Sequence, residues 1–137
     1  MRHVLFRVDK GLYAVALAAV REVVPAPGNF TRIPRAPAAV RGVINLRGRV
    51  VTVIELSALL GVPPPPSAQL LLLDRGRREL GLLVANVEGI EALEKFSAPP
   101  SRASAAVKGV ARLGAQAVTV LDPDGIDAAV AAAFNRS

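Results

Sequence analysis

The feature that most constrains the fold of this chain is an internal repeat. The stretch VRGVINLRGRVVTVIEL at 40–56 aligns without a gap on VKGVARLGAQAVTVLDP at 107–123, an offset of 67 residues (109 − 42). The same offset places YAVALAAVREV at 13–23 on LGLLVANVEGI at 80–90. Two blocks that agree on one ungapped spacing indicate a duplicated unit. A period near half the chain, with only two copies, excludes a solenoid.

Each copy is predicted to fold into five short strands, because apolar runs rich in Val and Leu are separated by turn residues. The expected strands are Val4–Val8, Leu12–Leu17, Val20–Val24, Val40–Leu46 and Val50–Ile54 in the first copy, and Gln69–Asp74, Glu79–Val84, Val87–Leu93, Val107–Leu113 and Ala117–Leu121 in the second. Polar residues alternate only weakly within them, which indicates burial on both faces, as in a small closed barrel. We therefore expect an all-β fold of two five-stranded barrels packed together.

Three further segments organise the chain around these strands. Pro63–Pro66 is predicted to be a stiff, extended separator between the copies. Ser57–Leu60 is predicted to form a helical turn, and 124–135 a C-terminal helix that starts near an aspartate and is rich in alanine. With 137 residues, the chain is expected to form one domain over 1–137, with approximate lobes at 1–62 and 67–123.

The positive charge is concentrated in the first copy. Residues 1–62 hold nine Lys and Arg against three acids, whereas residues 63–137 hold eight of each. Five arginines fall within 18 positions that contain no acid: Arg32, Arg35, Arg41, Arg47 and Arg49. This basic stretch could contact nucleic acid or an acidic protein, or could reflect a compositional bias. It contains no aromatic residue on which a base could stack, and this weakens the alternative of a basic β-barrel module that binds nucleic acid.

Composition and motifs argue against catalysis and against metal binding. The chain has no cysteine and a single histidine, His3, which we expect to face solvent beside a poorly held N-terminus. The acidic series Glu88, Glu91 and Glu94 is expected to form a solvated edge, and neither a P-loop nor a GxGxxG motif occurs. No apolar run reaches the roughly 18 residues of a membrane span, so the sequence predicts a soluble intracellular protein. The missing motifs predict that it has no cofactor.

The turn within 40–56 carries an arginine that folding does not explain. Gly48 suits a tight hairpin, because such a turn usually needs one residue at positive φ. Arg47 has no such role, and the second copy has Gly114 and Ala115 at the positions of Arg47 and Gly48. The second hairpin would therefore form without an arginine at its tip. Arg47 is then either a solvated turn residue or, as we favour, a residue that contacts a partner.

The stretch RIPRAPAAVRGVINLRGRVVTVIEL at 32–56 resembles the signature of the CheW-like domain, the adaptor of bacterial chemosensory arrays. In that signature a Pro-x-x-Pro loop leads into a G-V-x-N-L-R-G hairpin and then a V-x-V-I-D/E-L strand. YAVALAAVREVV at 13–24 is similar to the family's Y-x-V-x-x-x-x-V-x-E-I segment. GLLVANVEGI and VKGVARLG match the second half of the family, so the resemblance covers residues 4 to about 127.

The resemblance implies two SH3-like five-stranded barrels and no enzymatic activity. Members of the family couple chemoreceptors to the histidine kinase CheA, binding the regulatory domain of the kinase and the helical cytoplasmic tip of a methyl-accepting receptor. The positions that match the receptor-contact region are Val20, Glu22, Gly42 and Arg47. Asn45 and Gly48 also match the motif and are expected to shape the turn. The protein would be cytoplasmic and recruited to receptor arrays, with no membrane insertion and no nucleic-acid partner.

Two expectations about the partner follow. A groove with apolar residues and one arginine can bind a helical tip while the guanidinium forks onto a carboxylate, so we hypothesise that Val20 and Arg47 lie near the same groove. The basic first half indicates an acidic docking surface on the partner and binding that weakens with salt. A chain that has lost the kinase contact and acts as an inhibitor in the array is a further alternative.

Overall fold

In the computed structural model the described residues are 1–64, 66, 68–75, 78–99 and 105–135, so Pro65 of the predicted separator lies outside them. The elements in chain order are β1 (Arg2–Val8), β2 (Gly11–Ala16), the 3-10 turn η1 (Leu17–Ala19), β3 (Val20–Pro25), β4 (Val40–Leu46), β5 (Arg49–Glu55), α1 (Leu56–Leu60), β6 (Gln69–Arg75), β7 (Arg78–Val84), β8 (Asn86–Ala92), β9 (Val107–Leu113), β10 (Gln116–Leu121) and α2 (Pro123–Asn135). Each predicted strand and helix is confirmed, with ends that differ by at most two residues.

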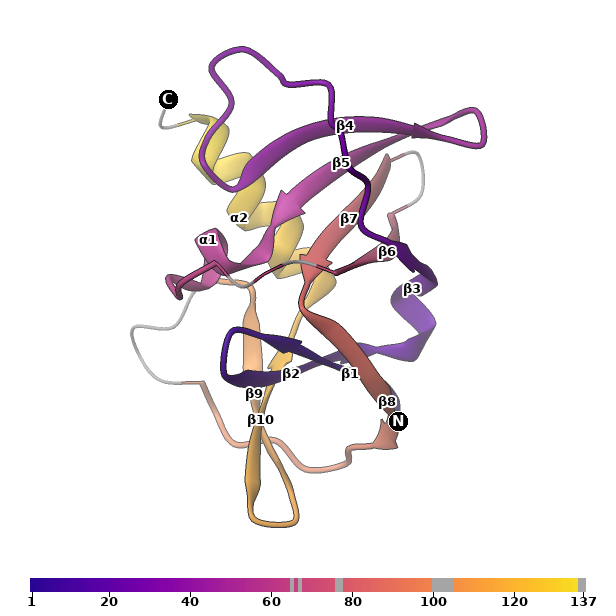
Figure 1. Cartoon of the computed structure of the whole chain (residues 1–137). Coiled ribbons are helices and arrows are strands. Elements are labelled where there is room, and N and C mark those ends of the chain that lie inside the picture. The colour runs from indigo at the N-terminus through magenta and orange to yellow at the C-terminus, as the bar shows by residue number, and fades with distance from the viewer. Residues whose placement is uncertain (65, 67, 76–77, 100–104, 136–137) are drawn as a thin grey trace.

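The strands form two five-stranded sheets, and each sheet combines strands from both copies of the repeat (Figure 1). The first sheet has the order β8-β1-β2-β10-β9, and the second has the order β3-β6-β7-β5-β4. Neighbouring strands are antiparallel except for the pairs β2–β10 and β5–β7, which are parallel. The two copies have thus exchanged their first hairpins, because β1–β2 lies in the sheet with β9 and β10 while β6–β7 lies beside β4 and β5.

The pairing registers repeat with the same spacing as the sequence. Val43 pairs with Thr52 in the first copy, and Val110 pairs with Thr119 in the second. Both outer hairpins carry a register shift at the same place, just after Val40 in one and just after Val107 in the other. The internal duplication inferred from the sequence is therefore present in the hydrogen bonding of the strands.

The expectation of closed barrels is wrong. Among the described strands, neither β8 with β9 nor β3 with β4 forms a pair, so both sheets remain open. The free edge of each outer strand is covered by the loop that precedes it, through an isolated bridge between Thr31 and Val43 in one sheet and between Ser97 and Val110 in the other. The loop thus occupies the edge that a closing strand would need.

The two sheets share a central core, and a smaller apolar cluster lies against the other face of each sheet. Leu70, Leu71, Leu72 and Leu73 of β6 are all fully buried. Leu71 and Leu73 belong to the central cluster, which also contains side chains of β1, β2 and α2, whereas Leu70 and Leu72 pack inside the second sheet. The complete burial of each leucine stabilises the folded chain by about 1.5–3 kcal/mol. Burial on both faces explains why the apolar residues of this strand do not alternate with polar ones.

The prediction of a solvent-facing His3 is also wrong. Its relative exposure is 1%, its Nδ1 lies 3.0 Å from the carbonyl oxygen of Met1, and its ring meets the ring of Phe96 edge to face. The reason is that β1 is an interior strand, so that His3 pairs with Ala16 on one side and with Glu91 on the other. Within the described ranges, no helix combines the length and the apolar character needed to cross a membrane.

Candidate functional site

The tip of the β4–β5 hairpin is held by its own backbone and by one side chain. The N–H of Gly48 donates to Oδ1 of Asn45 at 2.9 Å. Gly48 has a φ of 81°, and Arg47 has a φ of 53°, a left-handed value that most side chains avoid. At the equivalent position of the second copy Gly114 has a φ of 63°. Arg47 thus has a backbone conformation that a glycine would adopt more easily.

The guanidinium of Arg47 forks onto the carboxylate of Glu22 in β3. Its two terminal nitrogens donate to the two carboxylate oxygens at 2.6 and 2.8 Å. The hydrogen bond from Arg47 is the main reason that the pKa of Glu22 lies below its ordinary value, and the same contact raises the pKa of Arg47. The pair is open to water, with the Arg47 side chain 67% exposed. The contact connects the hairpin tip to an edge strand of the sheet.

A small hollow of about 180 Å³ lies around this pair, lined by Leu46 and by charged side chains of β3 and of the hairpin, Arg21, Glu22, Arg47 and Arg49. Behind it, the buried carboxylate of Glu79 forms ion pairs with Arg21, at 2.9 Å, and with Arg49. Three guanidinium groups therefore converge on two carboxylates. Such a surface can exchange an internal ion pair for one with a partner, because guanidinium groups bind carboxylates in a forked geometry.

The structure places the four predicted receptor-contact residues differently from one another. It brings Glu22 and Arg47 into direct contact. Val20 is half-buried against the central core and does not line the hollow at Arg47. Gly42 is buried below the bridging loop, where a Cβ would overlap the carbonyl oxygen of Thr31.

The basic stretch is partly neutralised within the chain. Arg41 donates to Glu55 at 3.1 Å and lies over the ring of Phe30, and Arg49 pairs with the buried Glu79. Arg32 and Arg35 are exposed, and neither has an ion pair in the part of the chain that the structure describes. Much of the charge surplus read from the sequence is therefore engaged internally.

Sequence reasoning missed Glu79, although the repeat contains a signal for it. The residue at the equivalent position of the first copy is Leu12, which is buried in the smaller cluster of the first sheet. An acid at a position where the other copy has a buried leucine indicates a dedicated partner. Here the partners are Arg21 and Arg49.

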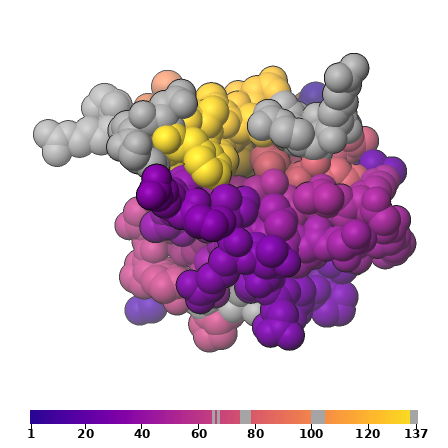
Figure 2. Space-filling view, turned by 90° about the horizontal axis from the view of Figure 1, so that it is seen from above, coloured from indigo at the N-terminus to yellow at the C-terminus, as the bar shows by residue number. Residues whose placement is uncertain are grey.

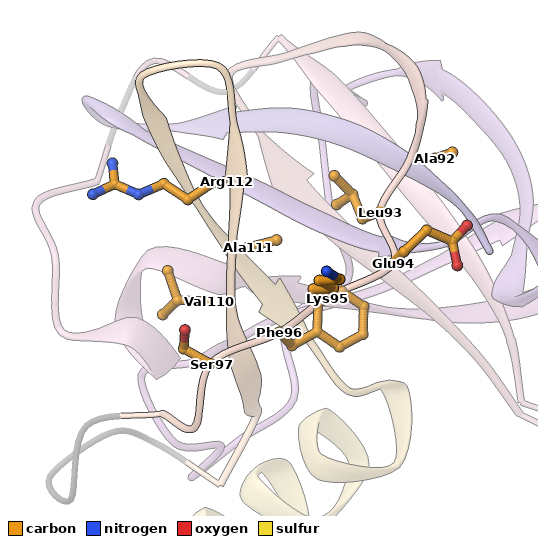
Figure 3. A pocket seen from close by; sticks show the side chains of 9 residues that line it. All are labelled: Ala92, Leu93, Glu94, Lys95, Phe96, Ser97, Val110, Ala111 and Arg112. Atoms are coloured by element: carbon orange, nitrogen blue, oxygen red, sulfur yellow. The ribbon is translucent and has the colours of Figure 1, made fainter.

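The repeat also duplicates a hollow beside the outer strand. In the second copy a hollow of about 440 Å³ lies between β9 and the loop after β8 (Figure 3). Phe96 and Ser97 of the loop and Val110 of β9 line it. The counterpart in the first copy, of about 390 Å³, is lined by Phe30, Thr31 and Val43 among others. The hollow is thus a product of the fold, whereas the Glu22–Arg47 pair is specific to the first copy.

Comparison with known proteins identifies related chains and a related structure. The model of the CheW-like domain family matches residues 2–130. A probable chemotaxis protein CheW of Rhizobium etli is 38% identical over 93 residues, covering 64% of this chain and 57% of the relative. The chemotaxis protein CheW of Rhizobium meliloti is 39% identical over 93 residues, with the same coverage of both chains. The chain thus spans just over half the length of these curated relatives.

The fold has a solved counterpart as well. The crystal structure of the scaffolding protein TtCheW from Thermoanaerobacter tengcongensis superposes with a TM-score of 0.81 at 25% sequence identity. The match covers 89% of this chain and 84% of the other. The likeness therefore extends over both sheets and is not limited to the hairpin motif.

Proposed function

Because the chain belongs to the CheW-like domain family, whose members are non-enzymatic scaffold and adaptor proteins, we propose that it is an adaptor of a bacterial chemosensory array. In this role it couples the cytoplasmic signalling tips of chemoreceptors to the regulatory domain of the histidine kinase CheA. It works in the cytoplasm, at the receptor array. The Glu22–Arg47 surface at the tip of the β4–β5 hairpin is the part that docks on the receptor.

The observation that carries this proposal is the state of Arg47. Its side chain is 67% exposed, and its hydrogen-bond partner is the accessible carboxylate of Glu22. Arginine is enriched at protein interfaces because its planar fork matches carboxylates and because it is less strongly hydrated than lysine. An acidic side chain on a receptor helix can therefore share or replace Glu22 as the partner of Arg47.

The same hairpin also has an exposed apolar side chain, which does not line the hollow at Arg47. Val50 follows Arg49 in β5 and is 66% exposed, although most valines of this chain's strands are buried or half-buried. Binding to a helix usually combines the burial of such an apolar side chain with a few oriented polar contacts. The tip thus offers both components within a few residues.

The decisive experiment is the substitution Arg47→Ala. We expect binding to a receptor tip fragment to weaken about ten-fold or more, which corresponds to about 1.4 kcal/mol. The free energy of unfolding should be nearly unchanged, because exposed ion pairs contribute little to stability. Binding is measured by titration calorimetry with the receptor tip, with the regulatory domain of the kinase, and with both together.

The matched control is Arg112→Ala, which removes an arginine of β9 that lies two residues before the turn of the second hairpin. Arg112 donates to the carbonyl oxygen of Ala115, within its own turn. This variant should bind the receptor tip like the parent chain. Undiminished binding by the Arg47→Ala chain, or a large loss of stability without a loss of binding, would show that Arg47 serves the fold and not the docking.

A further inference from the structure

A second candidate site lies at the base of the same hairpin, away from the Glu22–Arg47 pair. An open hollow of about 490 Å³ is bordered by the loop after β3, the ends of β5 and β7, and the segment after α1. Its polar lining consists of Arg41 and Glu55, and its apolar lining includes Pro27, Phe30, Pro64 and Leu83. A volume of this size is in the range that holds side chains or small molecules.

The carboxylate of Glu55 has acceptor capacity that the fold does not use. Its side chain is only 9% exposed, and Oε1 accepts a hydrogen bond from Nη1 of Arg41 at 3.1 Å. Oε2 is buried and has no hydrogen-bond partner among the described residues. An ionised carboxylate can accept about four hydrogen bonds, and a buried polar group without partners is unfavourable and therefore calls for an explanation.

The second copy shows what an acid at this position does when it serves the fold. The equivalent residue is Asp122, whose Oδ1 accepts a hydrogen bond from the N–H of Asp124 at the start of α2. Glu55 stands at the corresponding start of α1 but makes no side-chain hydrogen bond to that helix. Glu55 therefore does not cap its helix, and its carboxylate contacts Arg41 instead.

Arg41 and Glu55 together present a donor and an acceptor side by side. The guanidinium of Arg41 is held over the ring of Phe30, 5.6 Å from its centroid, and its Nη1 bonds to Glu55. The other N–H groups of Arg41 are available as donors because a guanidinium carries five of them. A carboxylate ligand would meet the charge of Glu55, and an ammonium ligand would meet that of Arg41. A neutral group with one donor and one acceptor avoids both repulsions.

We propose that this hollow binds the side-chain carboxamide of an asparagine or glutamine presented by a partner polypeptide. The amide N–H₂ donates to the carboxylate of Glu55, the amide C=O accepts from Arg41, and the methylene groups pack against Phe30, Pro27 and Leu83. Rotation about the last torsion of Glu55 is soft, so the carboxylate can turn to meet the donor. The inference does not depend on the proposed receptor-docking role of Arg47.

The test uses the full chain with carbon-13 label in its glutamate, phenylalanine and leucine side chains. Propionamide is the probe, with butylammonium and propionate as charged probes of similar size. We expect propionamide to cause saturable NMR shifts at Glu55, Phe30 and Leu83, with a millimolar dissociation constant, and no saturable shift at Phe96. The charged probes should bind more weakly. Tighter binding of butylammonium, or the absence of a saturable shift with propionamide, would overturn the proposal.

Two matched variants test whether propionamide binds at Glu55. Glu55→Gln keeps the shape of the side chain but removes the carboxylate, and should weaken propionamide binding about ten-fold or more, as expected for the loss of a hydrogen bond to a charged group. Asp122→Asn changes the equivalent residue of the second copy and preserves its capping ability, so binding should not change. Equal binding by all three chains would place the probe elsewhere and overturn the assignment, and the titration of the parent chain decides the question even if Glu55→Gln does not fold.

Discussion

Arg47 combines an unfavourable backbone with an exposed side chain. A non-glycine residue in the left-handed region costs about 1–2 kcal/mol, and the second copy has Gly114 at this position, with a similar φ. The ion pair between Arg47 and Glu22 is exposed to water and therefore contributes little to stability. Folding alone therefore favours glycine here, which supports a role for the arginine in contacts outside the chain.

The protonation of Glu22 reports on its contact with Arg47. The hydrogen bond from Arg47 lowers the pKa of Glu22 in the folded chain, so the contribution of this pair to stability is present above the pKa of the unfolded state. It is lost as the pH falls through the lower pKa of the folded state. A titration followed by side-chain carbon-13 NMR should show a higher midpoint for Glu22 in the Arg47→Ala chain. An unchanged midpoint would mean that the fork does not persist in solution.

The sequence identifies candidate residues but not the contacts between them. Arg47 and Glu22 were both identified from the motif, but 25 positions separate them and nothing in the sequence shows that β3 lies beside the hairpin tip. The environment of His3 was missed for a related reason, because the burial of a terminal strand depends on β8, which comes late in the chain. Glu55 was placed in the motif, but its unused carboxylate oxygen is visible only in three dimensions.

The two copies also agree in the hydrogen bonds between each outer strand and the loop that precedes it. The N–H of Thr31 donates to the carbonyl oxygen of Val43, and the N–H of Val43 donates back. Ser97 and Val110 exchange the same two hydrogen bonds in the second copy. Each bridging loop lies so close to a glycine of the outer strand, Gly42 or Gly109, that it leaves no room for a Cβ there.

Substitution of these two glycines should separate steric overlap from backbone strain. A Cβ at Gly109 would lie 2.6 Å from the carbonyl oxygen of Ser97, so Gly109→Ala should destabilise the chain by about 1–3 kcal/mol. Gly42 has the same crowding and also a φ of 149°, so Gly42→Ala should destabilise by about 2–4 kcal/mol. Urea denaturation with an unchanged m-value measures both. A stable Gly42→Ala chain that has lost receptor binding would instead favour a direct contact.

Element positions follow from local sequence, whereas sheet closure does not. Strand limits are fixed by turn residues such as Gly11, Gly48 and Gly114, and by apolar runs between them, and both kinds of signal are local. The mistaken expectation of closed barrels came from strands buried on both faces. That burial comes from the second sheet and from α2, which pack against the first through the shared central core.

The exchange of the first hairpins makes the whole molecule one unit. An ungapped repeat predicts which strands correspond, but it gives the same pattern whether each copy pairs within itself or with the other. The first sheet takes β8, β9 and β10 from the second copy, and the second sheet takes β3, β4 and β5 from the first. The topology therefore could not be read from the duplication. Figure 2 shows the first copy, in violet and magenta, packed directly against the yellow C-terminal helix.

A chain cut between its two copies should remain assembled. We expect that a protease site inserted after Val62 can be cleaved without separation of the halves, because β1 stays paired with β8 and β5 with β7. The cut chain should elute from a gel-filtration column at the position of the uncut chain and come apart only in denaturant. Separate folded halves in native buffer would contradict the exchange.

The distribution of charge predicts how binding depends on salt. The net charge is +6, and Arg32 and Arg35 are exposed without ion pairs among the described residues. We expect affinity for the receptor tip to fall roughly ten-fold or more from low to high salt, mainly through a slower association rate. Substitution of Arg32 and Arg35 by alanine should flatten this dependence. An affinity that does not change with salt would argue against an acidic partner surface.

The hairpin exchange also dictates the order of events during synthesis. β2 ends at Ala16, but its sheet neighbour β10 ends at Leu121. At translation speeds of about 5–20 residues per second, the ribosome needs roughly 5–20 s to deliver that neighbour after β2 has left the exit tunnel. Throughout this interval the nascent hairpin exposes Phe6, Val8 and Val15, which are fully buried in the finished protein. These side chains therefore reach their final neighbours only after the second copy has been synthesised.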